Sequence, residues 1–167
     1  MSGECMGYAE AVARLATALR FGIHPSLEGI RALTEALGAP QDAFRSVQVT
    51  GTNGKTSVVR MVGALLTAHG ERVGTYTSPH LVSYAERIAI GGTPVPEPWF
   101  ASAVQAAVRA ADAVGCVHRE GVCDGHAPEF TEFELMTAAA LWLFREKTVD
   151  WGVLEVGMGG RWDATSV

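Results

Sequence analysis

Hydrophobic and polar positions along the chain follow two different periods. Apolar residues three or four positions apart are typical of helices, and they predict helices over residues 8–19, 27–37, 55–69, 98–114 and 131–146. Alternating or continuous apolar runs predict strands over residues 46–50, 72–76, 87–90 and 149–156. Because strands and helices alternate, the pattern predicts an α/β domain with a mainly parallel sheet and helices on both of its faces.

Polar and glycine residues at the ends of these segments support the helix assignments. Ser26 can cap the second helix, and Gly70 can end the third. Thr131 and Glu134 have the spacing of a capping box, in which each side chain bonds the backbone N–H of the other residue. That role explains Glu134 completely, so it is not assigned to catalysis. The third helix carries one apolar stripe, formed by Val58, Val59, Met61, Val62, Leu65 and Leu66.

Composition indicates a globular protein of the cytosol. The chain has 167 residues, enough for one domain with a hydrophobic core, and 48% of them are hydrophobic while 19% are charged. The net charge is −5 and no basic run occurs, which argues against nucleic acid as a partner. No apolar segment approaches the length of a membrane span, and residues 1–4 show no signal-peptide pattern. We therefore expect a cytoplasmic location without membrane association.

The three cysteines leave two interpretations open. Their odd number and the lack of a C-x-x-C pair are typical of free thiols in a reducing compartment. Four zinc-type ligands also lie close together in the sequence: Cys116, His118, Cys123 and His126. Their spacing matches no standard zinc motif and the segment is rich in turn residues, so a solvated loop is favoured over a metal site.

The segment from Val47 to Ser57 reads as a strand, a glycine-rich turn and the start of a helix. This layout can bind phosphate, because glycines let backbone N–H groups approach it and the helix N-terminus adds partial positive charge. The expected nucleotide contacts are Gly51, Thr52, Asn53, Gly54, Lys55, Thr56 and Ser57. Lys55 can reach the terminal phosphates of ATP, and the hydroxyl of Thr56 or Ser57 can bind the accompanying Mg²⁺.

The match to the standard phosphate-binding loop is incomplete. In the pattern G-x-x-x-x-G-K-[ST], Gly54, Lys55 and Thr56 fit the end, but Val49 stands at the first glycine. A structural turn with an accidental lysine is therefore the alternative. The apolar strand before the turn and the apolar helix after it favour the phosphate site.

Glu155 stands at the end of the last apolar strand, where a carboxylate is costly to bury without a partner. Functional groups of open α/β sheets gather at the carboxyl ends of strands, so Mg²⁺ on the ATP phosphates is the favoured partner. A salt bridge to Arg161 is the structural alternative.

Three further segments carry little information when each is taken alone. Residues 77–81 are typical of an ordinary turn, with Ser78 a candidate oxygen ligand and His80 a candidate substrate contact. Glu86-Arg87 is typical of a surface charge pair. Trp162-Asp163 indicates only an exposed aromatic ring and an acid near a loop.

Taken together, these segments resemble one family. They are Thr50-Gly51-Thr52-Asn53-Gly54-Lys55, Thr77-Ser78-Pro79-His80-Leu81 with Glu86-Arg87-Ile88, Thr131-x-Phe133-Glu134, and the run from Leu154 to Thr165. In this order, over residues 20–167, they are similar to the bifunctional dihydrofolate synthase/folylpolyglutamate synthases of the Mur ligase superfamily. Related Mur ligases share the phosphate loop but not the Ser-Pro-His-Leu…Glu-Arg-Ile segment.

The resemblance implies a P-loop domain like the central ATPase domain of Mur ligases. It divides the chain into an N-terminal helical segment at 1–45 and an incomplete ATP-binding domain at 46–167. The family's C-terminal Rossmann-like domain, which completes the ATP and glutamate sites, is absent, as are a histidine for a second Mg²⁺ and a modified lysine. We therefore expect the N-terminal piece of a longer protein, with an exposed edge on its sheet.

The resemblance also implies a reaction. ATP phosphorylates the carboxylate of dihydropteroate or of a (tetrahydro)folate, and the amino group of L-glutamate attacks the resulting acyl phosphate, which releases ADP and phosphate. Lys55 and Glu155 are the implied catalytic residues. The implied Mg²⁺ ligands are Thr56, Ser78 and Glu155. The implied substrate contacts are Ser78, Pro79, His80, Thr131, Trp162, Asp163 and Ala164.

The chain departs from the family pattern at three positions. Thr56 stands where many members have glycine, Trp162 replaces a common leucine, and Ser166 replaces an asparagine. None of these changes removes a group that the chemistry needs. Two functions stay open: the ATP-binding part of a folate ligase that is a monomer at full length, and an ATP-binding remnant without ligase activity or a subunit completed in trans.

Overall fold

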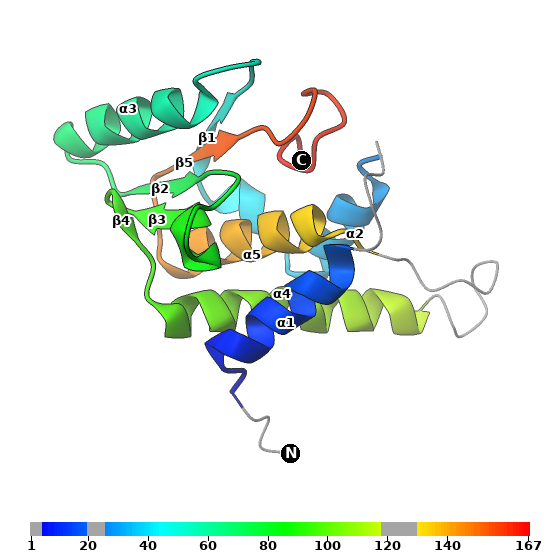
Figure 1. Cartoon of the computed structure of the whole chain (residues 1–167). Coiled ribbons are helices and arrows are strands. Elements are labelled where there is room, and N and C mark those ends of the chain that lie inside the picture. The colour runs from blue at the N-terminus through cyan, green and yellow to red at the C-terminus, as the bar shows by residue number, and fades with distance from the viewer. Residues whose placement is uncertain (1–4, 20–25, 118–129) are drawn as a thin grey trace.

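A five-stranded sheet forms the centre of the protein, with helices on both faces (Figure 1). The computed structural model describes residues 5–19, 26–117 and 130–167. The strands are β1 (Arg45–Val49), β2 (Val73–Tyr76), β3 (Ile88–Ile90), β4 (Thr93–Pro94) and β5 (Trp151–Glu155). They lie in the order β1-β5-β2-β3-β4, so β5 is enclosed between β1 and β2 although it comes last in the chain.

The sheet is mixed. Strands β1, β5 and β2 are parallel, in agreement with the mainly parallel sheet predicted from the sequence. Strands β3 and β4 run antiparallel to their neighbours. Gly91 and Gly92 join these two strands with φ values of 59° and 80°, and a two-residue turn with two positive φ angles matches the twist of an antiparallel hairpin. Strand β4 was not predicted, because two residues are too few to show a period.

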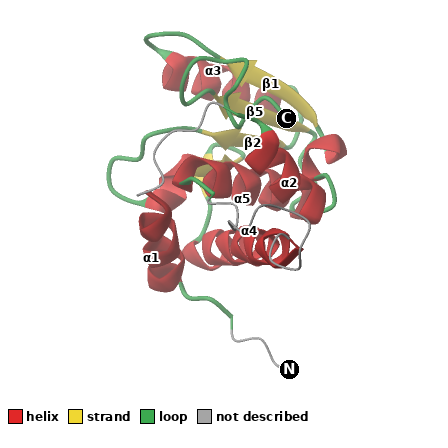
Figure 2. Cartoon of the chain, turned by 90° about the vertical axis from the view of Figure 1, so that its right-hand side faces the viewer, coloured by secondary structure: helices red, strands yellow, loops and turns green. Residues whose placement is uncertain are grey.

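The helices lie in layers on both sides of the sheet. The helices are α1 (Tyr8–Ala18), α2 (Glu28–Ala36), α3 (Lys55–Ala68), α4 (Glu97–Val117) and α5 (Glu132–Glu146), with short 3-10 turns η2 (Pro40–Ala43) and η3 (Tyr84–Arg87). Helix α3 covers one face of the sheet, α5 covers the other, and α4 lies behind α5 (Figure 1 and Figure 2). Within the described ranges, none of the helices combines the length and apolar character needed to span a bilayer.

The two faces of the sheet bury cores of different size. Under α3 the core is a small cluster made of Val49, Val59, Val73 and Val153. On the other face, α5 and the helices around it share a continuous core that includes Leu15, Ile30, Phe100, Met136 and Phe144. Residues from both sides of position 45 contribute to this core, and the division of the chain into two domains at that position stays a prediction.

The apolar stripe predicted for the third helix is only half buried. The buried or partly buried members are Val59, Val62 and Leu66. The other members, Val58, Met61 and Leu65, are 44%, 65% and 62% exposed. Helix α3 lies so close to the sheet that a Cβ at Gly63 would be 2.8 Å from Thr75 Cγ2. A helix seated on so narrow a face leaves the rest of its apolar side chains in solvent.

The helix ends follow the local signals with small shifts. The Ser26 hydroxyl accepts a hydrogen bond from the backbone N–H of Glu28, at 3.1 Å, but the N-cap position of α2 is Leu27, so Ser26 stands one residue before its predicted place. The capping box of Thr131 and Glu134 is confirmed, with both reciprocal bonds present. Helix α4 continues to Val117, three residues past its predicted end at residue 114.

Two glycines in neighbouring strands let α5 approach the sheet. A Cβ added at Gly74 would lie 2.4 Å from Phe144 Cε1. A Cβ at Gly152 would lie 2.6 Å from Phe44 Cε2 and 3.4 Å from Phe144 Cδ2. These positions therefore lack side chains because aromatic rings fill the space.

We expect Gly74→Ala to lower the free energy of unfolding by about 1–3 kcal/mol, because the added methyl group must displace the Phe144 ring in a close-packed core. Urea denaturation followed by circular dichroism measures the change. Gly7→Ala is the control, since a Cβ there meets no atom within 4 Å and its backbone is extended. At this helix cap we expect a loss below about 1 kcal/mol. Equal losses in the two variants would contradict the packing explanation.

Candidate functional site

The loops after β1, β5 and β2 meet at the carboxyl edge of the parallel strands. Thr50, after β1, donates its hydroxyl to the carbonyl oxygen of Gly159 in the loop after β5, at 3.0 Å. Ser78, after β2, donates its backbone N–H to Glu155 Oε2, at 3.3 Å. The structure therefore brings three of the motif segments together, as expected for parallel strands whose functional loops gather at one edge.

The loop from Gly51 to Gly54 has the geometry of a phosphate cradle. Gly51 and Gly54 have φ values of 147° and 75°, in the left-handed region that favours glycine. Helix α3 starts directly afterwards at Lys55, so the N–H groups of its first turn, which have no partner within a helix, lie at this loop. The Lys55 ammonium reaches back over the loop and donates to the carbonyl oxygen of Gly51, at 3.0 Å. The remaining predicted contacts Thr52, Asn53 and Ser57 are exposed.

Glu155 is the last residue of β5 and is only 3% exposed. Its two carboxylate oxygens accept hydrogen bonds from the Thr56 hydroxyl, at 3.0 and 2.9 Å, and one of them also accepts from the Ser78 N–H. Of the two hydroxyls that the sequence left open, Thr56 is thus the one that reaches the acid. In the part of the chain that the structure describes, Glu155 forms no ion pair, so the alternative of a salt bridge to Arg161 is wrong.

These groups fit a hard divalent cation such as Mg²⁺. Proteins bind Mg²⁺ through one or two carboxylates, completed by phosphate oxygens and water. Glu155 supplies a buried carboxylate and Thr56 supplies a hydroxyl, both directly beside the phosphate cradle. Ser78 contacts Glu155 through its backbone N–H, and its predicted role as an oxygen ligand stays a prediction.

A pocket of about 650 Å³ opens beside this group. Its walls come from the loop after β2, the first turn of α5 and the glycine-rich loop after β5. Six of the seven predicted substrate contacts line it: Ser78, Pro79, Thr131, Trp162, Asp163 and Ala164. His80 lies outside this lining and contacts Arg87 instead. The volume is in the range of pockets that enclose cofactor-sized ligands.

Asp163 stabilises the turn that forms one wall of the pocket. It is 6% exposed, and its carboxylate accepts from the backbone N–H groups of Met158 and Thr165, at 2.9 and 3.0 Å, and from the Thr165 hydroxyl, at 2.6 Å. The neighbouring Trp162 ring is 56% exposed, as its sequence context predicted, and the Arg161 guanidinium lies 5.3 Å from its centre. The acid therefore holds a turn that presents an aromatic ring at the rim.

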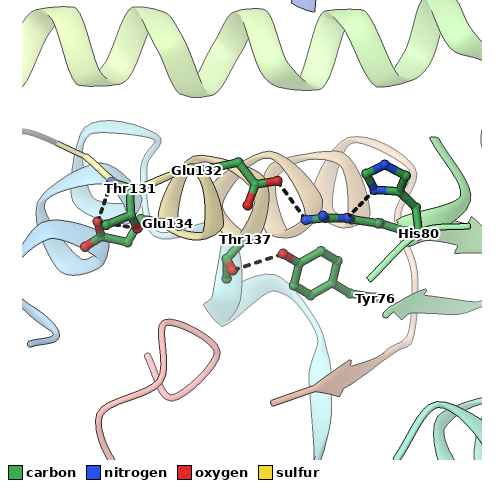
Figure 3. A network of polar contacts seen from close by, with 7 residues as sticks. Tyr76, His80, Thr131, Glu132, Glu134 and Thr137 are labelled. Atoms are coloured by element: carbon green, nitrogen blue, oxygen red, sulfur yellow. Dashed lines mark hydrogen bonds and ion pairs between the residues drawn. The ribbon is translucent and has the colours of Figure 1, made fainter. Parts of the chain in front are cut away.

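A chain of polar contacts forms another wall (Figure 3). Arg87 Nη1 donates to Glu132 Oε1 at 2.7 Å, and Arg87 Nε donates to His80 Nδ1 at 3.0 Å. The two side chains of the ion pair are only 10% and 9% exposed. The prediction of a surface pair at Glu86-Arg87 is therefore wrong, because Arg87 points inward from η3 to a partner on α5.

Sequence reasoning missed Arg87 and Glu132 as residues of the site. The available signal was weak: one charge stands directly before the apolar strand β3, and the other stands at the first position of a helix that is apolar nearly all round. Charged residues in such segments are seldom buried unless they are paired. The pairing itself joins residues 45 positions apart, which no local pattern records.

Burial changes the acid–base properties of two groups at this wall. Burial raises the pKa of the Glu132 carboxyl, and the Arg87 charge opposes that rise. Burial also raises the pKa of the fully buried Tyr76 hydroxyl, to which the Thr137 hydroxyl donates at 3.4 Å. Tyr76 therefore stays neutral at physiological pH and supports the wall by packing.

Glu86 holds the loop between β2 and η3. Its carboxylate accepts from the backbone N–H groups of Leu81, Val82 and Ser83, at 3.2, 3.4 and 3.0 Å. The bond from Leu81 is the largest of the effects that lower the pKa of Glu86 below its ordinary value. The loop that carries Ser78, Pro79 and His80 is thus anchored by one carboxylate at its end.

The suggested zinc ligands cannot be compared with this site. His118, Cys123 and His126 lie outside the described residues, as does the side chain of Cys116.

Comparison with known proteins relates this chain to ligases. No protein-family model matches it. The chain is 44% identical over 145 residues to the dihydrofolate synthase/folylpolyglutamate synthase of Mycobacterium tuberculosis. The aligned residues make up 87% of this chain and 30% of that protein. Folylpolyglutamate synthase of M. tuberculosis, solved in complex with ADP, matches with a TM-score of 0.85 at 41% identity, over 96% of this chain and 34% of that one. A solved complex of folylpolyglutamate synthase with AMPPCP and folate matches with a TM-score of 0.82 at 39% identity, over 97% and 38%.

The chain spans about a third of the length of these three relatives. Over that third, both sequence and structure agree along nearly the whole chain. The resemblance predicted from the motifs and the predicted α/β P-loop fold are therefore confirmed.

We expect Glu86→Gln to destabilise the chain at neutral pH, because an amide lacks the negative charge that accepts three N–H groups. The pKa of Glu86 is lowered in the folded chain, so its contribution is present above the ordinary value of 4.5 and is lost as pH falls through the lowered value. The urea midpoints of wild type and variant should therefore converge between about pH 5 and pH 3. Glu35→Gln, at an exposed position on α2, is the control for the loss of one negative charge. A Glu86→Gln offset that stays unchanged at low pH contradicts the assignment.

Proposed function

Because the chain belongs to the dihydrofolate synthase/folylpolyglutamate synthase family, about a third of whose length it spans, we propose that it is the ATP-binding part of a folate ligase. The reaction joins L-glutamate by an amide bond to dihydropteroate or to a (tetrahydro)folate. The observation that carries the proposal is that Thr56, next to Lys55 in the phosphate loop, bonds Glu155, and that Ser78, which lines the pocket, bonds Glu155 as well.

The phosphate cradle is assigned to ATP. The relatives solved with ADP and with AMPPCP match 96% and 97% of this chain. Backbone N–H groups of residues 51–55 would hold the β- and γ-phosphates, and Lys55 would stabilise the charge that develops during phosphoryl transfer. Glu155 and Thr56 would hold a Mg²⁺ ion, which supplies further neutralisation of the phosphates.

The pocket is assigned to the pterin-bearing substrate. Its volume suits a fused ring system, and the Trp162 ring at the rim can stack on a planar ligand. The carboxylate of this substrate would then point to the phosphate cradle, because Ser78 both lines the pocket and contacts Glu155. This orientation would bring the attacking carboxylate oxygen towards the terminal phosphate, and phosphoryl transfer requires the attacking and leaving oxygens to lie roughly in line.

The chemistry proceeds in two steps. A substrate carboxylate oxygen attacks the γ-phosphorus of ATP, ADP leaves, and an acyl phosphate forms. The amino nitrogen of L-glutamate then attacks the acyl carbon, loses a proton, and expels phosphate as the amide bond forms. Residues for L-glutamate are not assigned on this chain, so the second step is proposed for a protein of the full family length.

We expect Lys55→Ala to weaken binding of ATP with Mg²⁺ by about tenfold or more, the loss expected for one hydrogen bond between charged groups. Isothermal titration calorimetry of this chain measures the dissociation constant. Lys147→Ala is the matched control. Lys147 follows the C-terminal end of α5, the end away from the pocket, and its ammonium lies 3.4 Å from the centre of the Trp99 ring on α4. Unchanged ATP binding in Lys55→Ala would sink the nucleotide assignment.

We expect Glu155→Gln to abolish the gain in ATP affinity that Mg²⁺ provides, because the amide keeps the shape of the side chain but loses its charge. Titrations with and without Mg²⁺ measure the gain, and circular dichroism checks the fold. If Mg²⁺ raises the ATP affinity of Glu155→Gln as much as that of the wild type, Glu155 does not hold the ion. ADP release by this chain alone that depends on both L-glutamate and dihydropteroate would exclude the ATP-binding remnant.

A further inference from the structure

Arg87 is buried among side chains from three different segments. It is 8% exposed, and it bonds Glu132 on α5 and His80 in the loop after β2. Its guanidinium carbon also lies 4.9 Å from the centre of the Tyr84 ring on η3. Figure 3 shows Glu132 and His80 at opposite ends of this chain of contacts. Arg87 therefore links the loop to the helix that forms the pocket wall.

The contact with Arg87 determines which nitrogen of His80 carries the proton. A guanidinium has only N–H donors and keeps its charge throughout the pH range of folded proteins. His80 Nδ1, which lies 3.0 Å from Arg87 Nε, must therefore accept a hydrogen bond. A neutral imidazole has one donor and one acceptor nitrogen, so the proton lies on Nε2.

Glu132 holds Arg87 in the position from which its Nε donates to His80 Nδ1. The ion pair is nearly dry, with both side chains about one-tenth exposed, and a buried guanidinium without its carboxylate is strongly unfavourable. The imidazole is held from a second direction as well, because the ring centres of His80 and Tyr84 are 4.2 Å apart. His80 therefore has little freedom to turn its ring or exchange its tautomer.

We propose that Arg87 is a positioning residue: supported by Glu132, it fixes His80 as the neutral tautomer with its proton on Nε2. The loop after β2 then carries one N–H donor of fixed direction on His80, which follows Pro79 of the pocket lining but lies outside that lining itself. Such a donor suits an oxygen acceptor on a part of the substrate that extends past the pocket lining. That use rests on the proposed function, whereas the tautomer itself does not.

Long-range ¹H–¹⁵N correlation spectra of the histidine-labelled chain test the tautomer directly, without nucleotide or folate. The chain has five histidines, and the signals of His80 are those lost in His80→Gln. At about pH 8, above the ordinary titration range of histidine, we expect a protonated Nε2 and an unprotonated Nδ1, with this form favoured about tenfold or more. A proton on Nδ1, or an even mixture, overturns the proposal even if no Arg87 variant folds.

Arg87→Met tests the cause. Methionine keeps an apolar stem but has no donor, so we expect both tautomers of His80 to become populated and its nitrogen signals to move towards averaged positions. Arg145→Met, which removes a guanidinium from the other end of α5, should leave the His80 signals unchanged. A single, unchanged tautomer in a folded Arg87→Met variant overturns the role of Arg87.

His69 is an internal reference in the same spectra. Its Nδ1 lies 2.8 Å from the carbonyl oxygen of Leu65, which can only accept, so His69 should carry its proton on Nδ1. This opposite tautomer should persist in every variant of Arg87. Because these spectra need no ligand, a negative result leaves the proposed ATP site untouched, and a failure of ATP binding leaves the tautomer untouched.

Discussion

The buried carboxylate of Glu155 is the interaction on which the arrangement of the site depends. An acid that is 3% exposed at the end of an enclosed strand needs hydrogen-bond partners, and Thr56 and Ser78 supply them. Because β5 lies between β1 and β2, these partners come from the segments that follow its two neighbours. One acidic side chain thereby joins the phosphate cradle, the central strand and the pocket at a single edge of the sheet.

Packing on the other face of the sheet decides where the pocket lies. Phe144 occupies the space above Gly74 and Gly152, which lets α5 come close to the strands. The N-terminal turn of α5 then reaches the carboxyl edge and brings residues 131–134 to the pocket wall. The core and the site are thus connected through one helix, whose middle is fixed by an aromatic ring and whose end carries polar groups.

The phosphate cradle and the pocket wall differ in whether their charged groups are paired. The phosphate cradle is exposed, and the Lys55 ammonium lies over it, which suits a ligand that brings its own negative charges. In the pocket wall, Arg87 is neutralised by Glu132, and Asp163 is saturated by donors of its own turn. Such internally paired charges suit the uncharged ring system of the proposed substrate, because Arg87 and Asp163 keep their partners when water is displaced.

The sequence by itself determined the features that are written in contiguous residues. The five long helices, the three parallel strands, the Thr131–Glu134 capping box and the glycines of the phosphate loop were all predictable, because periodicity, caps and turns are local signals. Only the tertiary structure decided the rest: the ion pair of Arg87 with Glu132 and the exposure of half the apolar stripe on α3. The physical reason is that burial of a side chain depends on which distant element covers it, and no local period of the sequence contains that information.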